Sequence, residues 1–302
     1  MQFDKLPKSH EEQLDLLISR GLSVPDRAFA LHRLSKVNYY RLTAYRFPLA
    51  EPSNPDVFKA GGTFEDLWKI YDFDRNLRLL FLDAIEKIEV ALRSVWAYKL
   101  AATHGAHSYT DSTLFKSSVD HTRLLSKLDG DIYRSKEPFV KHYQKKYKIP
   151  ERPPIWAICE LMTLGQLSRF CKALKHNSDK QNIGSEFKLK PESLFSYFES
   201  LTVIRNICAH HARLWNKKLT VTCQKPRRWH DDFKIAWNDN SSQERNIYNV
   251  IVLTLYILKE LVPENMWGEH LLDLFSNHRL INPVEMGFPV NWASHNIWQR
   301  QS

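Results

Sequence analysis

The strongest hydrophobic pattern in the chain lies between Leu67 and about Ala102. Apolar residues recur there at steps of three and four, which is the spacing of one face of an α-helix. Thr63 stands before this pattern as a helix-capping residue does, and Gly105 follows its end. The pattern predicts one long helix, whose charged residues we interpret as an exposed face with ion pairs three and four residues apart: Asp72, Asp74, Arg75, Arg78, Glu86, Glu89 and Arg93.

Shorter helices are predicted on the N-terminal side of this segment. Ser9 and Glu12 form a capping-box pattern at the start of a first helix, which Gly21 closes. A second helix is expected to begin after Pro25 and to run toward Phe47. Three prolines and two adjacent glycines then mark a loop of about 15 residues before the long helix.

Several helices are predicted on the C-terminal side, after shorter helices and loops in residues 106–150. An almost wholly apolar helix is expected for residues 155–165, with Glu160 as its one interruption. Pro191 fits the first position of a helix that we extend to residue 215. A last helix is predicted from about Glu244 to Leu261, followed by a tail that contains Trp and Pro.

These patterns predict an all-α protein, a helical bundle with an N-terminal helical extension and a C-terminal helical or irregular tail. We divide it into an N-terminal helical segment (1–62), a helical core (63–230) and a C-terminal helix with a Trp-rich tail (231–302), packed as one compact unit. The chain has 302 residues and only 9 glycines, which are few for a fold built from tight turns.

The chain is basic, with 43 Lys and Arg residues against 34 Asp and Glu residues. This surplus favours nucleic acid or an anionic membrane face as a partner, although it also serves solubility alone. No apolar run approaches the roughly 20 residues that span a bilayer, and Met1 is followed by a polar segment. We therefore expect a cytoplasmic protein without a membrane partner.

The cysteines and the missing catalytic signatures argue against several classes of site. The four cysteines form no C-x-x-C pair, so a finger-type zinc site is not expected. The chain also lacks a Gly-rich phosphate loop, a G-x-S-x-G elbow and an H-E-x-x-H motif. We expect neither a metal nor a cofactor.

The chemically most specific segment is RNICAHHARLWN, from Arg205 to Asn216. On a regular helix over residues 194–215, Arg205 falls within an apolar stripe, and it points about 140° away from His210. Asn206, His210 and Arg213 share another face. Because Arg205 and His210 diverge, we expect their cleft at a junction between helices, formed by two subunits.

An arginine and a histidine at this spacing suit the cleavage of RNA without a metal. A guanidinium remains charged and can bind two phosphate oxygens, while an imidazole can take a proton from a 2′-hydroxyl or give one to the leaving oxygen. In the alternative interpretation, Arg205 pairs with Glu160 or another acidic side chain, and His210 caps or packs. Arg27 and His32 have the same spacing without a following Asn, so spacing alone is weakly specific.

Three further groups are candidates for contacts with RNA. Tyr39, Tyr40 and Arg41 interleave rings and a guanidinium as a single-strand platform does, or they form an aromatic face packed on the core. Two basic runs could contact phosphates or remain solvated surface, and they contain Lys145, Lys146, Arg227 and Arg228.

Several blocks along the chain carry a resemblance to a known family. They are residues 20–22, 38–42, 71–78, 88–93, 153–165, 205–216 and 286–289. With these blocks the chain resembles bacterial abortive-infection proteins of the AbiD/AbiF kind, the Abi_2 family of phage defence. That family is similar to HEPN proteins, helical domains in which an R-x4-6-H motif marks metal-independent ribonucleases.

The resemblance implies a role for each residue of the motif. Arg205 and His210 would form the active pair and Asn206 the polar residue after the arginine, although His211 also fits the family spacing. Arg93, on another helix, would support the same core. HEPN ribonucleases commonly pair two motifs in one cleft, so a homodimer is implied. A toxin of this kind implies restraint, by a bound small RNA or by a release that the phage triggers.

Three hypotheses follow from these observations. The first is a metal-independent endoribonuclease of an abortive-infection system. The second is a non-catalytic helical protein that binds RNA or senses a phage component. The third is a basic DNA-binding regulator built on the N-terminal helices.

Overall fold

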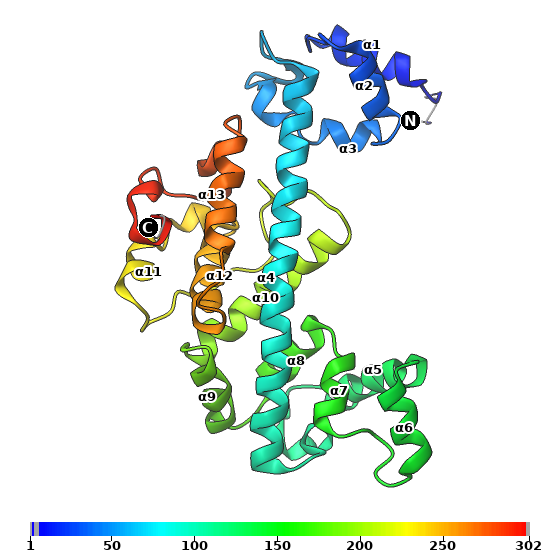
Figure 1. Ribbon diagram of the computed structural model, residues 1–302, viewed down its shortest axis with the longest axis vertical. Helices are drawn as coiled ribbons and strands as arrows, with labels where there is room; N and C mark the ends of the chain where they lie inside the picture. Colours follow the sequence, from blue (N-terminus) through cyan, green and yellow to red (C-terminus); the bar gives the residue numbers. More distant parts are fainter. Residues whose placement is uncertain (1, 3–5, 300–302) are drawn as a thin grey trace.

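The computed structural model describes residue 2 and residues 6–299 of the chain. In this part of the chain there are thirteen α-helices and a single two-stranded hairpin, which confirms the all-α prediction. The helix α4 (Phe64–His104) has 41 residues and runs through most of the length of the molecule (Figure 1). Its bounds agree with the hydrophobic pattern: Thr63 caps it by accepting from the Asp66 amide at 3.0 Å, and Gly105 ends it with a φ of 87°.

The helices that pack on α4 form one continuous apolar core with it. They are α7 (Ile155–Leu161), α8 (Leu164–Ala173), α9 (Asn177–Glu186), α10 (Pro191–Ala209), α12 (Tyr248–Leu261) and α13 (Trp267–Asn277). The apolar stripe of α4 is fully buried at Ile70, Leu77 and Phe81, as the periodicity predicts. Burying such a stripe is the main source of stability for a long helix.

The N-terminal unit, residues 6–62, lies at one end of α4 (Figure 1). It contains α1 (His10–Ser19), α2 (Arg27–Leu34), α3 (Tyr39–Thr43) and the antiparallel strands β1 (Ala50–Glu51) and β2 (Asn54–Phe58). The capping box of Ser9 and Glu12 is confirmed. The prediction of one helix running toward Phe47 is wrong, because α2 ends at Leu34 and Asn38 caps a separate α3.

The α5–α7 unit, residues 106–161, lies at the other end of α4 (Figure 1). It contains α5 (His121–Arg134), α6 (Pro138–Lys146) and α7. The single helix predicted over residues 155–165 is two helices. Thr163 forms a capping box with Gln166, which starts α8 in a new direction after Met162.

The C-terminal third is more helical than predicted. After α11 (Asp231–Ala236) come α12, which begins at Tyr248 rather than at Glu244, and then α13, in a segment where the sequence pattern predicts an irregular tail. The tryptophans are packing residues: Trp267 is buried and donates its ring N–H to the carbonyl of Leu80 at 2.7 Å. Short 3₁₀ segments fill connections at η1 (Phe47–Leu49), η2 (Ser108–Thr110), η3 (Ser112–Leu114), η4 (Ser241–Gln243), η5 (Pro283–Met286), η6 (Trp292–Ser294) and η7 (Asn296–Trp298).

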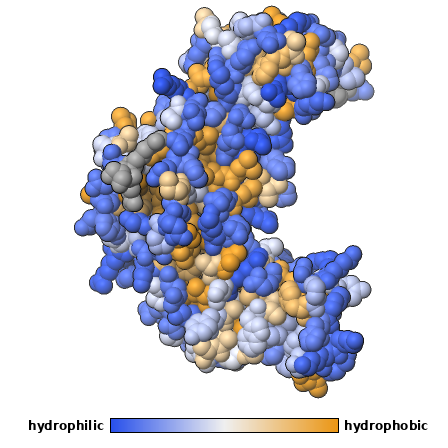
Figure 2. All heavy atoms as spheres, in the orientation of Figure 1, coloured by the Kyte–Doolittle hydropathy of each residue, from blue (hydrophilic) through white to orange (hydrophobic). Residues whose placement is uncertain are grey.

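The molecule is curved, and its surface is hollowed between the N-terminal unit and the α5–α7 unit (Figure 2). The C-terminal end of α10, yellow-green in Figure 1, reaches this hollow side. Among the described residues, no helix is long and apolar enough to cross a membrane.

Candidate functional site

The helix that carries the motif ends inside it. α10 starts at Pro191, as predicted, but it stops at Ala209, with His210 as its C-cap and His211 in the left-handed region at a φ of 56°. The Ala212 amide donates to the Ile207 carbonyl at 2.9 Å and the His211 amide to the Cys208 carbonyl at 3.0 Å. These two bonds define a Schellman turn with histidine at the position that glycine usually occupies. The helical projection to residue 215 is therefore wrong beyond the end of α10, although the His210 amide still donates to the Asn206 carbonyl at 3.0 Å.

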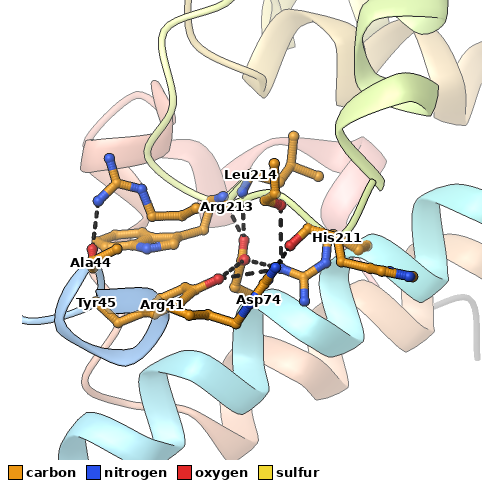
Figure 3. Close-up of polar contacts among 10 residues, drawn as sticks. Arg41, Ala44, Tyr45, Asp74, His211, Arg213 and Leu214 are labelled. Carbon is orange, nitrogen blue, oxygen red and sulfur yellow. Dashed lines mark hydrogen bonds and ion pairs between the residues drawn. The ribbon is translucent and has the colours of Figure 1, made fainter. Parts of the chain in front are cut away.

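The chain beyond the turn is fixed by a buried carboxylate on α4. Asp74 Oδ1 accepts from the amides of Leu214 at 2.9 Å and Trp215 at 2.7 Å (Figure 3). Its other oxygen accepts from the Tyr45 hydroxyl at 2.7 Å and pairs with Arg78. Asp74 is fully buried and Arg78 is 5% exposed. Asp74 thus connects the turn both to α4, on which it lies, and to Tyr45 in the N-terminal unit.

The charge state of this cluster follows from its burial. Burial raises the pKa of the Asp74 carboxyl, and the Arg78 guanidinium is the largest opposing influence. Burial also raises the pKa of the Tyr45 hydroxyl, which therefore remains protonated and donates to Asp74. An acceptor with four donors is well satisfied for a buried carboxyl group.

The prediction that Asp74 and Arg78 belong to an exposed charged face is wrong. They do form the predicted pair four residues apart, but it lies inside the protein. A signal was present in the sequence: Ile70, Asp74 and Arg78 follow one another at steps of four, so they continue an apolar stripe of the helix.

The N-terminal unit also contacts the turn directly. Arg41 on α3 donates to the His211 carbonyl, and Arg213 donates to the Ala44 carbonyl at 2.5 Å (Figure 3). The Arg213 guanidinium also lies over the Phe47 ring, 5.1 Å from its centroid. Arg213 therefore supports the turn through backbone and ring contacts in the N-terminal unit.

Arg205, the first arginine of the motif, forms no ion pair with an acidic side chain of the described residues. It is half-buried on α10, and its Nη1 donates to the side-chain oxygen of Asn206 at 3.3 Å. No described carboxylate lies within ion-pair distance of it. Asn206, His210 and His211 are all exposed beside it at the end of the helix. A guanidinium, an amide and two imidazoles thus stand close together in the sequence at the end of α10, within residues 205–211, and a guanidinium can bind an anion.

The proposed pairing of Glu160 with Arg205 is wrong. Glu160 Oε2 lies 3.4 Å from Arg93 Nη1, and the side chain of Glu160 is 54% exposed. Arg93 also pairs with Glu89 at 2.7 Å and donates to the Met162 carbonyl at 2.9 Å. These contacts join α4 to α7 and to the start of α8. Glu160 interrupts an apolar sequence because it lies on the outer side of a short helix.

The three groups considered for RNA contacts lie in different places. Arg41 adjoins the motif, beside Tyr40, which is 79% exposed, and Tyr39, whose hydroxyl accepts from Arg20 at 3.2 Å. Lys145 and Lys146 are exposed at the end of α6, in the α5–α7 unit. Arg227 and Arg228 are exposed at a groove beside the start of α10, which three lysines also line, Lys188, Lys190 and Lys225. The structure brings Arg41 to the motif and keeps the other two groups apart from each other.

Other reactive groups near the motif are inert in this arrangement. Burial raises the pKa of the Cys208 thiol to about 12, so it remains protonated at neutral pH. Within the described residues, no three His, Cys, Asp or Glu side chains are grouped so that they could hold a metal ion. The chemistry available at this surface is that of Arg205, Asn206, His210 and His211.

Comparison with known proteins gives one match. A family model described as "Abi-like protein" matches residues 32–216, which is more than half of the chain. This range contains the Asp74 cluster, Arg41 and the whole motif. No curated protein and no solved structure matched the chain.

Proposed function

We propose, since this chain belongs to the Abi-like protein family, that it acts in abortive infection as a toxin that cleaves RNA without a metal. One observation carries the proposal. Arg205 has no described carboxylate partner, and it lies with Asn206 near the end of α10, just before a turn that carries two exposed imidazoles and that Asp74 holds in place. A guanidinium without a carboxylate partner is available to bind two oxygens of a phosphate.

The reaction that suits these groups is internal transesterification of RNA. Arg205 binds two non-bridging oxygens of the scissile phosphate and stabilises the charge that builds up there. One imidazole, of His210 or His211, takes the proton of the 2′-hydroxyl as its oxygen forms a bond to phosphorus. The bond to the 5′-oxygen breaks, and that oxygen leaves with a proton from an imidazolium. The products are a 2′,3′-cyclic phosphate and a 5′-hydroxyl.

A homodimer is the proposed active form. The motif lies at the open end of α10 on the hollow side of the molecule, where a second copy can approach. Two motifs facing each other would enclose one phosphodiester and supply an imidazole for each proton transfer. This is the arrangement that the resemblance to HEPN ribonucleases implies. A small RNA bound in the cleft would keep the enzyme inactive.

The test is an RNA cleavage assay in excess EDTA with a matched pair of variants. Wild-type protein, Arg205→Ala and His210→Ala are each incubated with total RNA, and product ends are mapped. The control is His32→Ala, because Arg27 and His32 repeat the spacing of the motif and Arg27 is bonded to Glu11 and Asp15. We expect wild type and His32→Ala to cleave and Arg205→Ala to fail, and His210→Ala to fail if His210 is the imidazole that transfers the proton. Cleavage that EDTA abolishes would contradict the mechanism.

A second candidate function is a non-catalytic protein that binds RNA or a phage component. One observation favours it: the second half of the motif is used by the fold, since Leu214 and Trp215 are buried and Arg213 is bonded to Ala44. In that case all variants bind RNA equally and none cleaves it.

A further inference from the structure

A second candidate binding surface lies between α6 and α7, far from the motif. It is a cavity of about 620 Å³ at the opposite end of α4 from the N-terminal unit. Aromatic rings dominate its lining, from Phe139, Tyr143 and Tyr147 on one side and Trp156 on the other. It is built from residues that the proposed reaction does not use.

The walls of this cavity are held in place by hydrogen bonds. The Tyr143 hydroxyl donates to the Pro150 carbonyl at 2.7 Å, and the Tyr109 hydroxyl donates to the Pro153 carbonyl at 2.7 Å. Between these anchors, Arg152 forms two bonds to the Asp129 carboxylate at 2.7 and 2.8 Å. The loop that joins α6 to α7 is therefore fixed, and the cavity is formed before any ligand arrives.

Large apolar side chains around this cavity face solvent. Ile149 is 91% exposed and Trp156 is 57% exposed. Trp156 also lines a neighbouring cavity with Tyr98, which is 70% exposed. Contiguous exposed rings of this kind mark a surface that meets a partner.

The charge around the rings is positive. Lys145, Lys146 and Lys148 stand in the last turn of α6 and just beyond it, and none of them forms an ion pair with a described carboxylate. The ammonium of Lys146 lies 5.3 Å from the centroid of the Tyr147 ring. The rings of Tyr147 and Tyr143 lie side by side, with 5.1 Å between their centroids and an angle of 37° between their planes. The acid at the rim, Glu160, is already paired with Arg93.

We propose that this cavity binds single-stranded RNA, with unpaired bases stacked on Trp156 and Tyr147 and phosphates held by the lysines. Rings that interleave with cations are what a flexible strand requires, because every base has a face to stack and every link carries a negative charge. An apolar ligand would have no use for three unpaired lysines. The identity of the strand as RNA rests on the proposed function. The site adds a contact at the far end of the molecule from the cleavage motif.

The test is fluorescence anisotropy with the full chain and a labelled single-stranded 2′-O-methyl oligonucleotide. This probe lacks the attacking hydroxyl, so binding is measured without cleavage. The variants are Trp156→Ala and Trp156→Phe, and the control is Tyr133→Ala, an 86% exposed ring on α5 that does not line the cavity. We expect Trp156→Ala to weaken binding about tenfold, and Trp156→Phe and Tyr133→Ala to bind nearly as wild type. Lys145→Ala should make the affinity less dependent on salt.

The outcomes separate this proposal from the proposed function. Equal affinity of wild type and Trp156→Ala overturns the RNA site, even if wild type cleaves RNA and Arg205→Ala does not. Loss of affinity in Trp156→Ala without cleavage by any variant supports the site and contradicts the nuclease. If sedimentation gives Trp156→Ala half the molar mass of wild type, a second copy covers this surface, and that result also overturns the proposal. The proposal is also overturned if a proline-rich peptide binds wild type more tightly than the oligonucleotide does.

Discussion

Asp74 accepts the backbone amide of Trp215 at 2.7 Å across 141 positions of sequence. This contact joins the N-terminal third of α4 to the end of the motif. The turn that presents His210 and His211 is therefore not placed by α10 alone. It is placed by a buried carboxylate, its partner Arg78 and the N-terminal unit, so the stability of the core and the geometry of the candidate site are coupled.

We predict that Asp74→Ala strongly destabilises the protein. The substitution leaves Arg78 buried without its partner and frees two backbone amides, and breaking a buried pair from one side costs about 3–5 kcal/mol. The free energy of unfolding is measured by urea denaturation. Asp83→Ala is the matched control, since Asp83 pairs with Lys87 four residues later on the surface and its loss costs about 0.5 kcal/mol or less. A cost below about 1 kcal/mol for Asp74→Ala would show that the cluster does not hold the turn.

His211→Gly is expected to stabilise the protein. Glycine adopts a φ of 56° without the steric cost that histidine carries there, which is roughly 1 kcal/mol. His211→Val should destabilise it, because a β-branched residue is poorly accommodated in this region. If His211 has the left-handed conformation, the melting temperature rises in His211→Gly and falls in His211→Val.

The same variant separates the two imidazoles in catalysis. If His210 transfers the proton, His211→Gly cleaves RNA at close to the wild-type rate with its fold intact. If His211 transfers it, cleavage falls by about two to four orders of magnitude while the protein becomes more stable. Single-turnover rates on a defined RNA decide between these, and His210→Ala must show the reverse result.

Arg205→Ala is expected to remove cleavage while leaving stability nearly unchanged. The loss of a charge-stabilising donor lowers the rate by about two to three orders of magnitude. Unfolding should change by less than about 1 kcal/mol, because Arg205 makes no ion pair with any described acid and its recorded bond is to the exposed Asn206. Arg213→Ala provides the contrast, since Arg213 is bonded to Ala44 and covers Phe47, and its loss should cost stability. The cleavage rate and the free energy of unfolding are measured for both variants. A large loss of stability with an unchanged cleavage rate in Arg205→Ala would refute this assignment.

Arg41 is predicted to be a positioning residue for the turn. It donates to the His211 carbonyl from α3, so Arg41→Ala should lower the cleavage rate by about tenfold without abolishing it. Arg41→Lys should recover part of the loss, because an ammonium can reach the same acceptor. The matched control is Arg20→Ala, which loses only a bond to Tyr39 in the same unit. An unchanged rate for Arg41→Ala would separate the N-terminal unit from the reaction.

Much of the helical framework followed from local signals. Thr63 and Gly105 bounded the long helix, Ser9 started the first one and Pro191 started α10, because a cap depends on amides and side chains within a few residues of each other. The pattern of apolar residues gave the buried stripe of α4 for the same reason. The motif itself was visible as a run of chemical groups.

What the sequence alone did not provide was the partner of each charged group. Asp74 was assigned to solvent and Glu160 to Arg205, whereas Asp74 is buried under the turn and Glu160 meets Arg93. The four-residue step from Ile70 does place Asp74 on the buried stripe of its helix. Periodicity within one helix does not identify the distant segment that packs there, so it gives the partner of neither acid.

The end of α10 was likewise decided by tertiary structure. Residues 210–215 have no glycine or proline to stop the helix, so the local pattern allowed it to continue. It stops because Asp74, Arg78 and Arg41 together bind the backbone of the turn, and those bonds outweigh the strain of a left-handed histidine. The sequence thus determined which groups the site contains, and the packing of the N-terminal unit and α4 against the turn decided how they are presented.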